Sequence, residues 1–284
     1  MNRRHLYRMF AVAAVSLAAA LPAGALMLKC PPDSVQVGDA CIDRYESSIW
    51  QIPSGNTALV RRAQLGRASL ADLTNGGATQ VSPASTCSPA FPPTFDATGN
   101  WTSLLFAVSV AGVEPTSCVT WFQAEQACAL SGKRLLTNQE WQRAAAGTPD
   151  PGTDDGGTDC NIGGLGMPAN TGSRAKCASN WGAFDMVGNV EEWVADWTAQ
   201  PTVCVGWGGF SDDRMCLAGA STTAPGPGAL FRGGSFSGVF VDSGVFAVDA
   251  TNPARSARGI GFRCGRTGIS TPAPTLPSGI SPTK

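Results

Sequence analysis

Histidine is almost missing from this chain, because His5 is the only copy in 284 residues. Ser-His-Asp triads, Cys-His pairs, facial-triad iron sites and histidine-ligated zinc or copper sites all need this residue. Lysine is nearly as scarce, so a serine nucleophile would find few bases; its copies are Lys29, Lys133, Lys176 and Lys284. These absences exclude most classes of hydrolase and metalloenzyme. Carboxylate pairs for glycoside chemistry stay open, because any acidic protein offers such pairs.

Long hydrophobic runs are also rare, and the one that stands out extends from Met9 to Leu21. It follows three arginines in the first eight residues and precedes small residues at 23–25, so residues 1–25 are predicted to be an export signal. The run is too short to span a bilayer comfortably, and we expect no membrane span after signal removal. The remaining chain is slightly acidic and has no basic patch, which argues against a nucleic-acid partner. We expect a periplasmic or secreted protein.

By contrast, the chain is rich in glycine, with 34 copies, and holds ten cysteines, all of which follow the predicted signal. In an exported chain an even number of cysteines is usually paired. Residues 26–266 form one predicted domain, and the Pro/Ser/Thr-rich residues 267–284 are predicted to be a disordered tail. Sequence alone leaves the connectivity of the disulfides open.

Local patterns predict a few regular elements. Cys30 to Ile49 has the pattern of a hairpin that turns at Gly38-Asp39. Thr120 and Thr137 each begin a capping box and therefore a helix. Residues 51–115 are expected to form loops with short strands, and residues 147–177 a long polar insertion.

The segment N-W-G-A-F-D-M-V-G-N-V-E-E-W-V-A-D-W, residues 180–197, interleaves aromatic and acidic side chains without a helical or strand period. One interpretation is an aromatic core segment with solvated acids. The other is a backbone folded around a hard cation. Calcium takes six to eight oxygen ligands, and carboxylates of Asp185 and Glu192 with carbonyls of Gly188 and Val190 are suitable.

Five segments resemble one family. D-M-V-G-N-V-E-E-W is similar to the D-M-x-G-N-V-x-E-W signature of the formylglycine-generating enzyme (sulfatase-modifying factor) family. Residues 118–147, F-R-G-G-S-F at 231–236, I-G-F-R-C at 260–264 and C-I-D-R-Y-E at 41–46 resemble other family segments in the expected order. The resemblance covers residues 30–266 and implies an α+β, C-type-lectin-like fold that is loop-rich and disulfide-bonded.

The resemblance also implies ligands and pairings. It favours the calcium interpretation and places part of a second calcium site at Asn161 and Ile162, although the acidic part of that motif is not recognisable. It implies a disulfide between Cys128 and Cys264. Three further pairs would each close a short loop: Cys30–Cys41, Cys160–Cys177 and Cys204–Cys216. The two cysteines that remain then pair as Cys87–Cys118.

The family's oxidase binds copper through two cysteine thiolates, three and eight residues after the serine of R-G-G-S. That serine is Ser235, so the matching positions are Gly238 and Ser243, and neither is a cysteine. The resemblance therefore predicts that copper is absent and formylglycine-generating activity lost. The groove candidates are Arg232, Ser235, Phe236 and Asp242, and we expect a structural salt bridge for Arg232.

Three functions remain. The first is an exported, calcium-stabilised family member that binds a peptide, protein or glycan in the family groove without copper chemistry. The second is an active oxidoreductase, either a formylglycine-generating oxidase or an enzyme like family relatives in siderophore maturation. The third is a structural component of the envelope.

Overall fold

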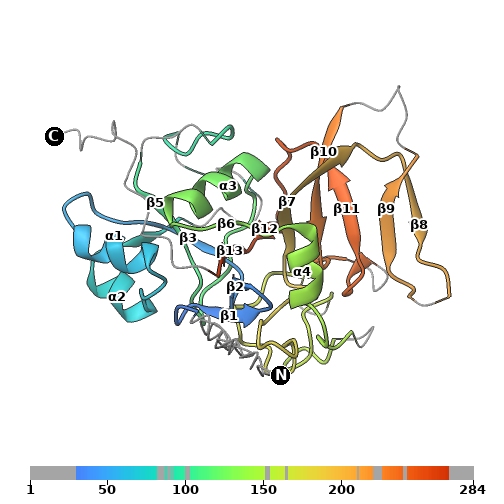
Figure 1. Cartoon of the computed structure of the whole chain (residues 1–284), viewed down its shortest axis with the longest axis horizontal. Coiled ribbons are helices and arrows are strands. Elements are labelled where there is room, and N and C mark those ends of the chain that lie inside the picture. The colour runs from blue at the N-terminus through green and yellow to red at the C-terminus, as the bar shows by residue number, and fades with distance from the viewer. Residues whose placement is uncertain are drawn as a thin grey trace, which may run out of the picture.

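The computed structural model combines small sheets with short helices and much irregular backbone (Figure 1). It describes residues 30–81, 87, 91, 93–99, 103–150, 154–163, 166–209, 211–219, 226–238 and 242–268. The predicted export signal and residues 269–284 of the predicted tail lie outside this part of the chain. Thr267, placed in the tail by the sequence, still belongs to the last strand.

The helices are α1 (Thr57–Gln64), α2 (Leu70–Asn75), α3 (Trp121–Leu130) and α4 (Asn138–Ala144). The strands are β1 (Ser34–Val37), β2 (Ala40–Asp43), β3 (Ser48–Gln51), β4 (Thr79–Gln80), β5 (Leu105–Val108), β6 (Arg134–Leu135), β7 (Glu191–Ala199), β8 (Val203–Gly206), β9 (Arg214–Ala218), β10 (Pro227–Arg232), β11 (Val248–Thr251), β12 (Ile260–Phe262) and β13 (Cys264–Thr267).

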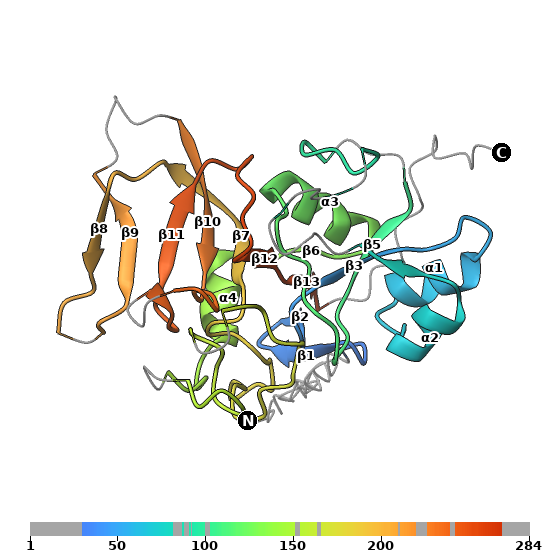
Figure 2. The same cartoon turned by 180° about the vertical axis from the view of Figure 1, so that it is seen from behind.

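The largest sheet has six strands in the order β12-β7-β10-β11-β9-β8. β7 and β10 run antiparallel through its centre, while β12 joins β7 in parallel. Figure 2 shows α4 against β7 and β10, with β8 at the outer edge of the sheet. Neighbouring residues of β7 point to opposite faces, so one face packs on α4, while the other packs largely on α3 and the core around Trp193.

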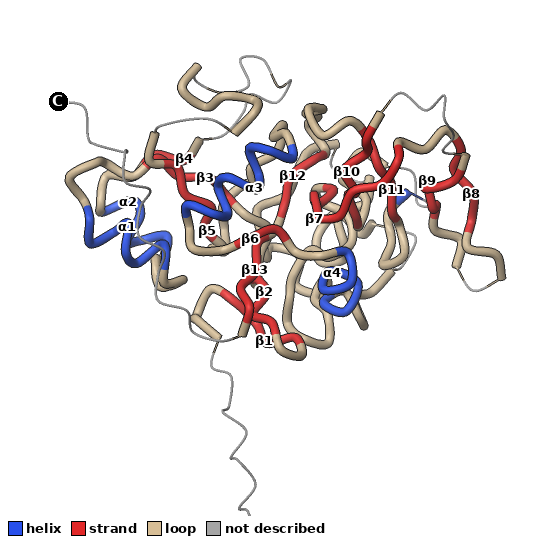
Figure 3. Tube along the Cα trace, turned by 45° about the horizontal axis from the view of Figure 1, so that its top comes forward, coloured by secondary structure: helices blue, strands red, loops and turns tan. Residues whose placement is uncertain are grey.

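Two smaller sheets occupy the other half of the molecule. One has the order β1-β2-β13-β6 and the other β4-β3-β5. Figure 3 shows α1 and α2 beside the three-stranded sheet, and α3 between it and the large sheet. One core cluster joins these sheets to Trp193 of β7, and a second packs Trp141 of α4 against β1, β2 and the large sheet.

Several local predictions are confirmed. β1 and β2 form the expected hairpin, and α3 and α4 begin with the predicted capping boxes at Thr120 and Thr137. The expectation of loops and short strands over residues 51–115 was incomplete, because α1 and α2 lie there. Their signals are Asn56, whose side chain caps α1, and a capping box of Ser69 with Asp72 at α2.

All ten cysteines are paired, in the five predicted disulfides: Cys30–Cys41, Cys87–Cys118, Cys128–Cys264, Cys160–Cys177 and Cys204–Cys216. Cys128–Cys264 joins α3 to β13 across 136 residues. In the chain-entropy model, a bridge that closes so long a loop stabilises the folded state by about 4–5 kcal/mol, because it lowers the entropy of the unfolded chain. Within the described part of the chain, no helix is long and apolar enough to cross a membrane.

Candidate functional site

A tight turn follows β10 and carries the R-G-G-S-F segment. Gly234 has φ +75°, and a Cβ there would lie 2.3 Å from the Asp242 carbonyl oxygen. Only glycine permits both this conformation and this close approach. The approach brings Gly238 and Ser243 together, because a Cβ on Gly238 would lie 2.9 Å from the Ser243 Oγ. The Gly238 N–H and the Ser243 hydroxyl both donate to the Ser235 carbonyl, at 3.1 and 3.3 Å.

A cavity of about 280 Å³ opens beside this turn, between it and the strands β7 to β11. Arg232, Ser235, Gly238 and Asp242 line it, so the structure brings together most of the groove residues that the sequence predicted. Phe236 is the exception: it is buried, and its ring lies 5.5 Å from the Arg258 guanidinium. The cavity therefore lies beside the R-G-G-S turn, where the sequence predicted the groove residues.

Arg232 does not form the expected salt bridge among the described residues. Its guanidinium lies 4.6 Å from the Trp141 ring centroid and donates to the Gln142 side chain and the Val245 carbonyl. Burial lowers its pKa to about 10, while the charge of Asp213 acts in the opposite direction. Arg232 thus lines the cavity, while its guanidinium packs against Trp141 and Gln142 of α4.

The cavity wall is acidic, with carboxylates from Glu191, Asp242 and Asp249. Asp242 is paired with Arg214 at 2.7 Å, and Asp249 accepts a hydrogen bond from the Ala250 N–H. No hydrogen bond or ion pair reaches the Glu191 carboxylate from the described residues. Its pKa is raised to about 8 by burial first and then by Asp249. At neutral pH this side chain can donate or accept a hydrogen bond, whichever a ligand requires.

Glu192, the next residue, points to the opposite face and has a full set of partners. Its carboxylate accepts from Arg263 Nη2 at 2.7 Å, from Arg263 Nε at 3.1 Å and from Trp141 Nε1 at 2.8 Å. Arg263 is itself buried and also donates to the carbonyls of Asp43 and Phe184. This arrangement is a buried ion pair that orients the end of β7.

The predicted calcium site of Asp185, Gly188, Val190 and Glu192 fits this geometry only in part. Asp185 is buried, its Oδ2 accepts from the Gly172 N–H at 2.8 Å, and its pKa is raised to about 6, chiefly by burial. The Glu192 oxygens, however, already accept three N–H groups. Among the described residues no cluster of acidic, cysteine or histidine side chains is placed to hold a metal ion. The calcium site therefore stays a prediction.

Asn161 and Ile162, predicted for a second calcium site, lie against the same segment. The Asn161 carbonyl accepts from the Asn189 N–H at 2.8 Å, and the Asn161 amide donates to the Asn189 side chain at 3.1 Å. Ile162 is buried in a small cluster with the Cys160–Cys177 disulfide. The structure thus brings both predicted calcium segments together.

The copper site that the resemblance implies does not fit the residues present. Gly238 and Ser243 are adjacent, as a metal-binding pair would be, but they provide no sulfur. All ten cysteines are in disulfides, and a disulfide sulfur is not a thiolate ligand. The two positions are therefore close to each other, but they lack the thiolates that would bind copper.

The two tryptophans of β7 differ in burial. Trp193 is fully buried, whereas Trp197 is 42% exposed. Its ring packs edge-on against Trp121 at 5.0 Å and lies 6.0 Å from Phe122, which forms a small aromatic cluster at the surface.

Sequence reasoning missed several cavity residues. Glu191 could have been found from the sequence, because neighbouring residues of a strand point to opposite faces of the sheet, so Glu191 and Glu192 cannot face the same way. Asp249, Arg214 and the Cys204–Cys216 disulfide also line the cavity. They come from β8, β9 and β11, and nothing in the sequence pairs those strands with the R-G-G-S turn.

Residues 97–267 match the family described as "Sulfatase-modifying factor enzyme 1-like domain". This match covers more than half of the chain, so the protein belongs to that family, and the predicted α+β, formylglycine-generating-enzyme-like fold is confirmed. Hercynine oxygenase of Mycolicibacterium smegmatis is 32% identical over 140 residues, which are 45% of this chain and 31% of the relative. The chain thus spans about a third of that relative.

Solved structures show more distant likeness. The Major Tropism Determinant I1 variant is 17% identical, with a TM-score of 0.45, and the match covers 84% of this chain and 55% of that one. PvdO from Pseudomonas aeruginosa is 19% identical, with a TM-score of 0.40 and 80% of each chain covered. Neither likeness carries an argument about function.

Proposed function

We propose that this protein is an exported member of the family that binds a peptide, protein or glycan in the cavity beside the R-G-G-S turn, without copper oxidase chemistry. The observation that carries the proposal is the Glu191 carboxylate, which lines the cavity and has no partner among the described residues. Glu191 is partly exposed, but its surroundings raise the pKa of its carboxyl group, and a ligand that bonds to this group would offset the cost of its desolvation.

Other contacts support the proposal. The Ser235 and Ser237 hydroxyls lie 3.3 Å apart at the cavity, and the Arg214–Asp242 pair is partly exposed there. A small number of polar groups in a concave site is typical of ligand binding. The five disulfides support export, because such bridges persist in oxidising compartments. Calcium at the segment from Asp185 to Glu192 is a separate part of the proposal.

The test is binding of the purified protein to peptide and glycan arrays, followed by calorimetry with the best ligand. Glu191→Gln and Asp249→Asn are expected to weaken binding about tenfold each, which is the loss of one good hydrogen bond. Asp72→Asn, on the distant helix α2, is the matched control and should bind like the wild type. Equal affinity of all four proteins for every ligand would refute a site at this cavity.

An oxidoreductase is the second candidate, because the similar mycolicibacterial protein is named an oxygenase. The chain has neither free thiols nor a histidine beyond His5, so such a reaction would need other residues of the cavity. Incubation with oxygen and hercynine, followed by mass spectrometry of the small molecule, distinguishes this candidate from a binding protein. An oxidised product would favour it.

A further inference from the structure

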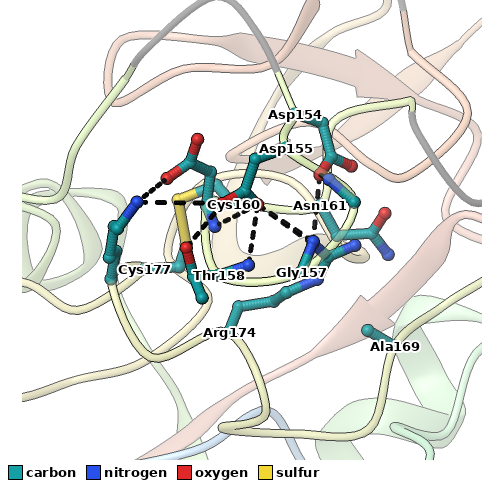
Figure 4. A network of polar contacts seen from close by, with 12 residues as sticks. Asp154, Asp155, Gly157, Thr158, Cys160, Asn161, Ala169, Arg174 and Cys177 are labelled. Carbon is teal, nitrogen blue, oxygen red and sulfur yellow. Dashed lines mark hydrogen bonds and ion pairs between the residues drawn. A yellow bond between two sulfur atoms is a disulfide. The ribbon is translucent and has the colours of Figure 1, made fainter.

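A buried arginine lies at the second predicted calcium site. The Arg174 side chain is 2% exposed, and its Nη1 donates to Asp154 Oδ1 at 3.1 Å and lies 3.7 Å from Asp155 Oδ1. In Figure 4 the guanidinium points toward Asp154 and the Asn161 side chain. Arginine stays charged when buried, so a permanent positive charge occupies this position.

The loop before Arg174 is built to hold its acidic partners. Asp155 Oδ1 accepts from the N–H groups of Gly157, Thr158 and Asp159, at 2.9, 2.7 and 2.8 Å. The Cys160–Cys177 disulfide ties the two ends of the segment together, as Figure 4 shows. These bonds fix a carboxylate beside the guanidinium, which is the condition under which a buried charge is tolerated.

Two buried polar atoms indicate which ligand this site can bind. Arg174 Nη2 and Asn161 Oδ1 are both buried, and neither has a hydrogen-bond partner among the described residues. Calcium is coordinated by oxygen acceptors alone. A guanidinium N–H is a donor, and its positive charge repels a second cation, so the two cannot share one site. The orphaned donor and acceptor instead match a bridging water.

We propose that the Arg174 guanidinium is an internal cation that takes the place of calcium at the site of Asn161 and Ile162. The loop of residues 154–163 then keeps its conformation without a divalent ion.

The test is hydrogen–deuterium exchange of residues 154–163 in calcium and in chelator, with calcium stoichiometry from calorimetry. Wild-type exchange in this segment is expected to be the same in both. Arg174→Asp removes the internal cation and adds an oxygen ligand. It should bind one more calcium ion per chain than the wild type, and its segment should exchange on the order of tenfold faster in chelator than in calcium.

Arg61→Asp, an equal charge change on the exposed surface of α1, is the matched control and should add no ion. Arg174→Asn replaces Arg174→Asp if the latter does not fold, with the same expected direction. Faster exchange of wild-type residues 154–163 in chelator would overturn the proposal, as would a folded Arg174→Asp protein with no additional ion. Calcium at the first site alone protects residues 185–192 and leaves the proposal intact.

Discussion

The two faces of β7 give two different environments to neighbouring glutamates. On the α4 face, the Glu192 carboxylate accepts hydrogen bonds from Arg263 and Trp141. On the cavity face, Glu191 has no hydrogen-bonding partner among the described residues, and burial and Asp249 raise its pKa to about 8. The same residue type is therefore structural on one side of the sheet and available to a ligand on the other.

The difference shows that a place in the family motif does not make an acidic residue a ligand-binding residue. Glu192 belongs to the motif, yet its carboxylate pairs with Arg263 and Trp141 inside the protein. The less conspicuous Glu191 lines the cavity. Substitutions on the two faces should therefore separate stability from binding.

Glu192→Gln should have the largest effect, because it removes the carboxylate charge to which the buried Arg263 is hydrogen-bonded. We expect the free energy of unfolding to fall by about 3–5 kcal/mol, measured by denaturant titration. Asp72→Asn disrupts the exposed pair of Arg62 and Asp72 and weakens the capping box of α2, and it should cost about 1 kcal/mol. Similar losses for both variants would contradict a structural role for Glu192.

Glu191→Gln should act in the opposite direction, stabilising the protein increasingly as pH rises from about 4.5 to about 8. The folded pKa of Glu191 is near 8 and its ordinary value is 4.5, so the folded state holds this proton more firmly than the unfolded chain. Its contribution to stability is complete below about pH 4.5 and is lost progressively as pH rises from there to about 8.

The glutamine variant lacks that loss. It should nearly match the wild type at pH 5 and be more stable at pH 8 by on the order of 2 kcal/mol, since partial exposure reduces the effect. Thermal unfolding at both pH values checks this. A variant that is less stable than the wild type at pH 8 would show that Glu191 has a stabilising partner in the protein.

Trp197→Ala tests the other end of the same face. Because Trp197 is 42% exposed and contacts Trp121 edge-on, its loss should cost about 1 kcal/mol. Denaturant titration should show a clearly smaller change than for the fully buried Trp193, where truncation costs about 3–5 kcal/mol. Equal losses would place Trp197 in the core after all.

Gly238→Cys with Ser243→Cys should change the fold least while adding thiols to the cavity. The short distance between these positions predicts one further disulfide after oxidation and binding of one Cu(I) after mild reduction. Thiol counting and competition with a copper indicator measure both. Each single variant is the control and should bind no copper. A double variant with two free, unreactive thiols would show that the positions are not adjacent in solution.

Much of this fold was predictable because its signals are local or carried by a motif. Capping boxes gave α3 and α4, and loop lengths with the family resemblance gave all five disulfides. α1 and α2 were missed although they also have capping residues, since the surrounding glycines and prolines favoured loops.

Only those residues of the site that are close together in the sequence were predictable. Ser235, Gly238 and Asp242 were found because they share one turn. Asp249 and Arg214 were not, because long-range strand pairing places them there. The pairing of Glu192 with Arg263 crosses 71 residues and decides whether that carboxylate is free for a metal ion. Sequence spacing contains no information on such competition.

The central claim is that the cavity binds its ligand without thiolate–copper chemistry, and one assay tests it most directly. The wild-type protein is incubated with Cu(I), oxygen, a reductant and a sulfatase-type cysteine peptide, and the peptide is analysed by mass spectrometry. The absence of sulfur at Gly238 and Ser243 predicts that no formylglycine forms. Formylglycine produced catalytically by the unmodified protein would contradict the account.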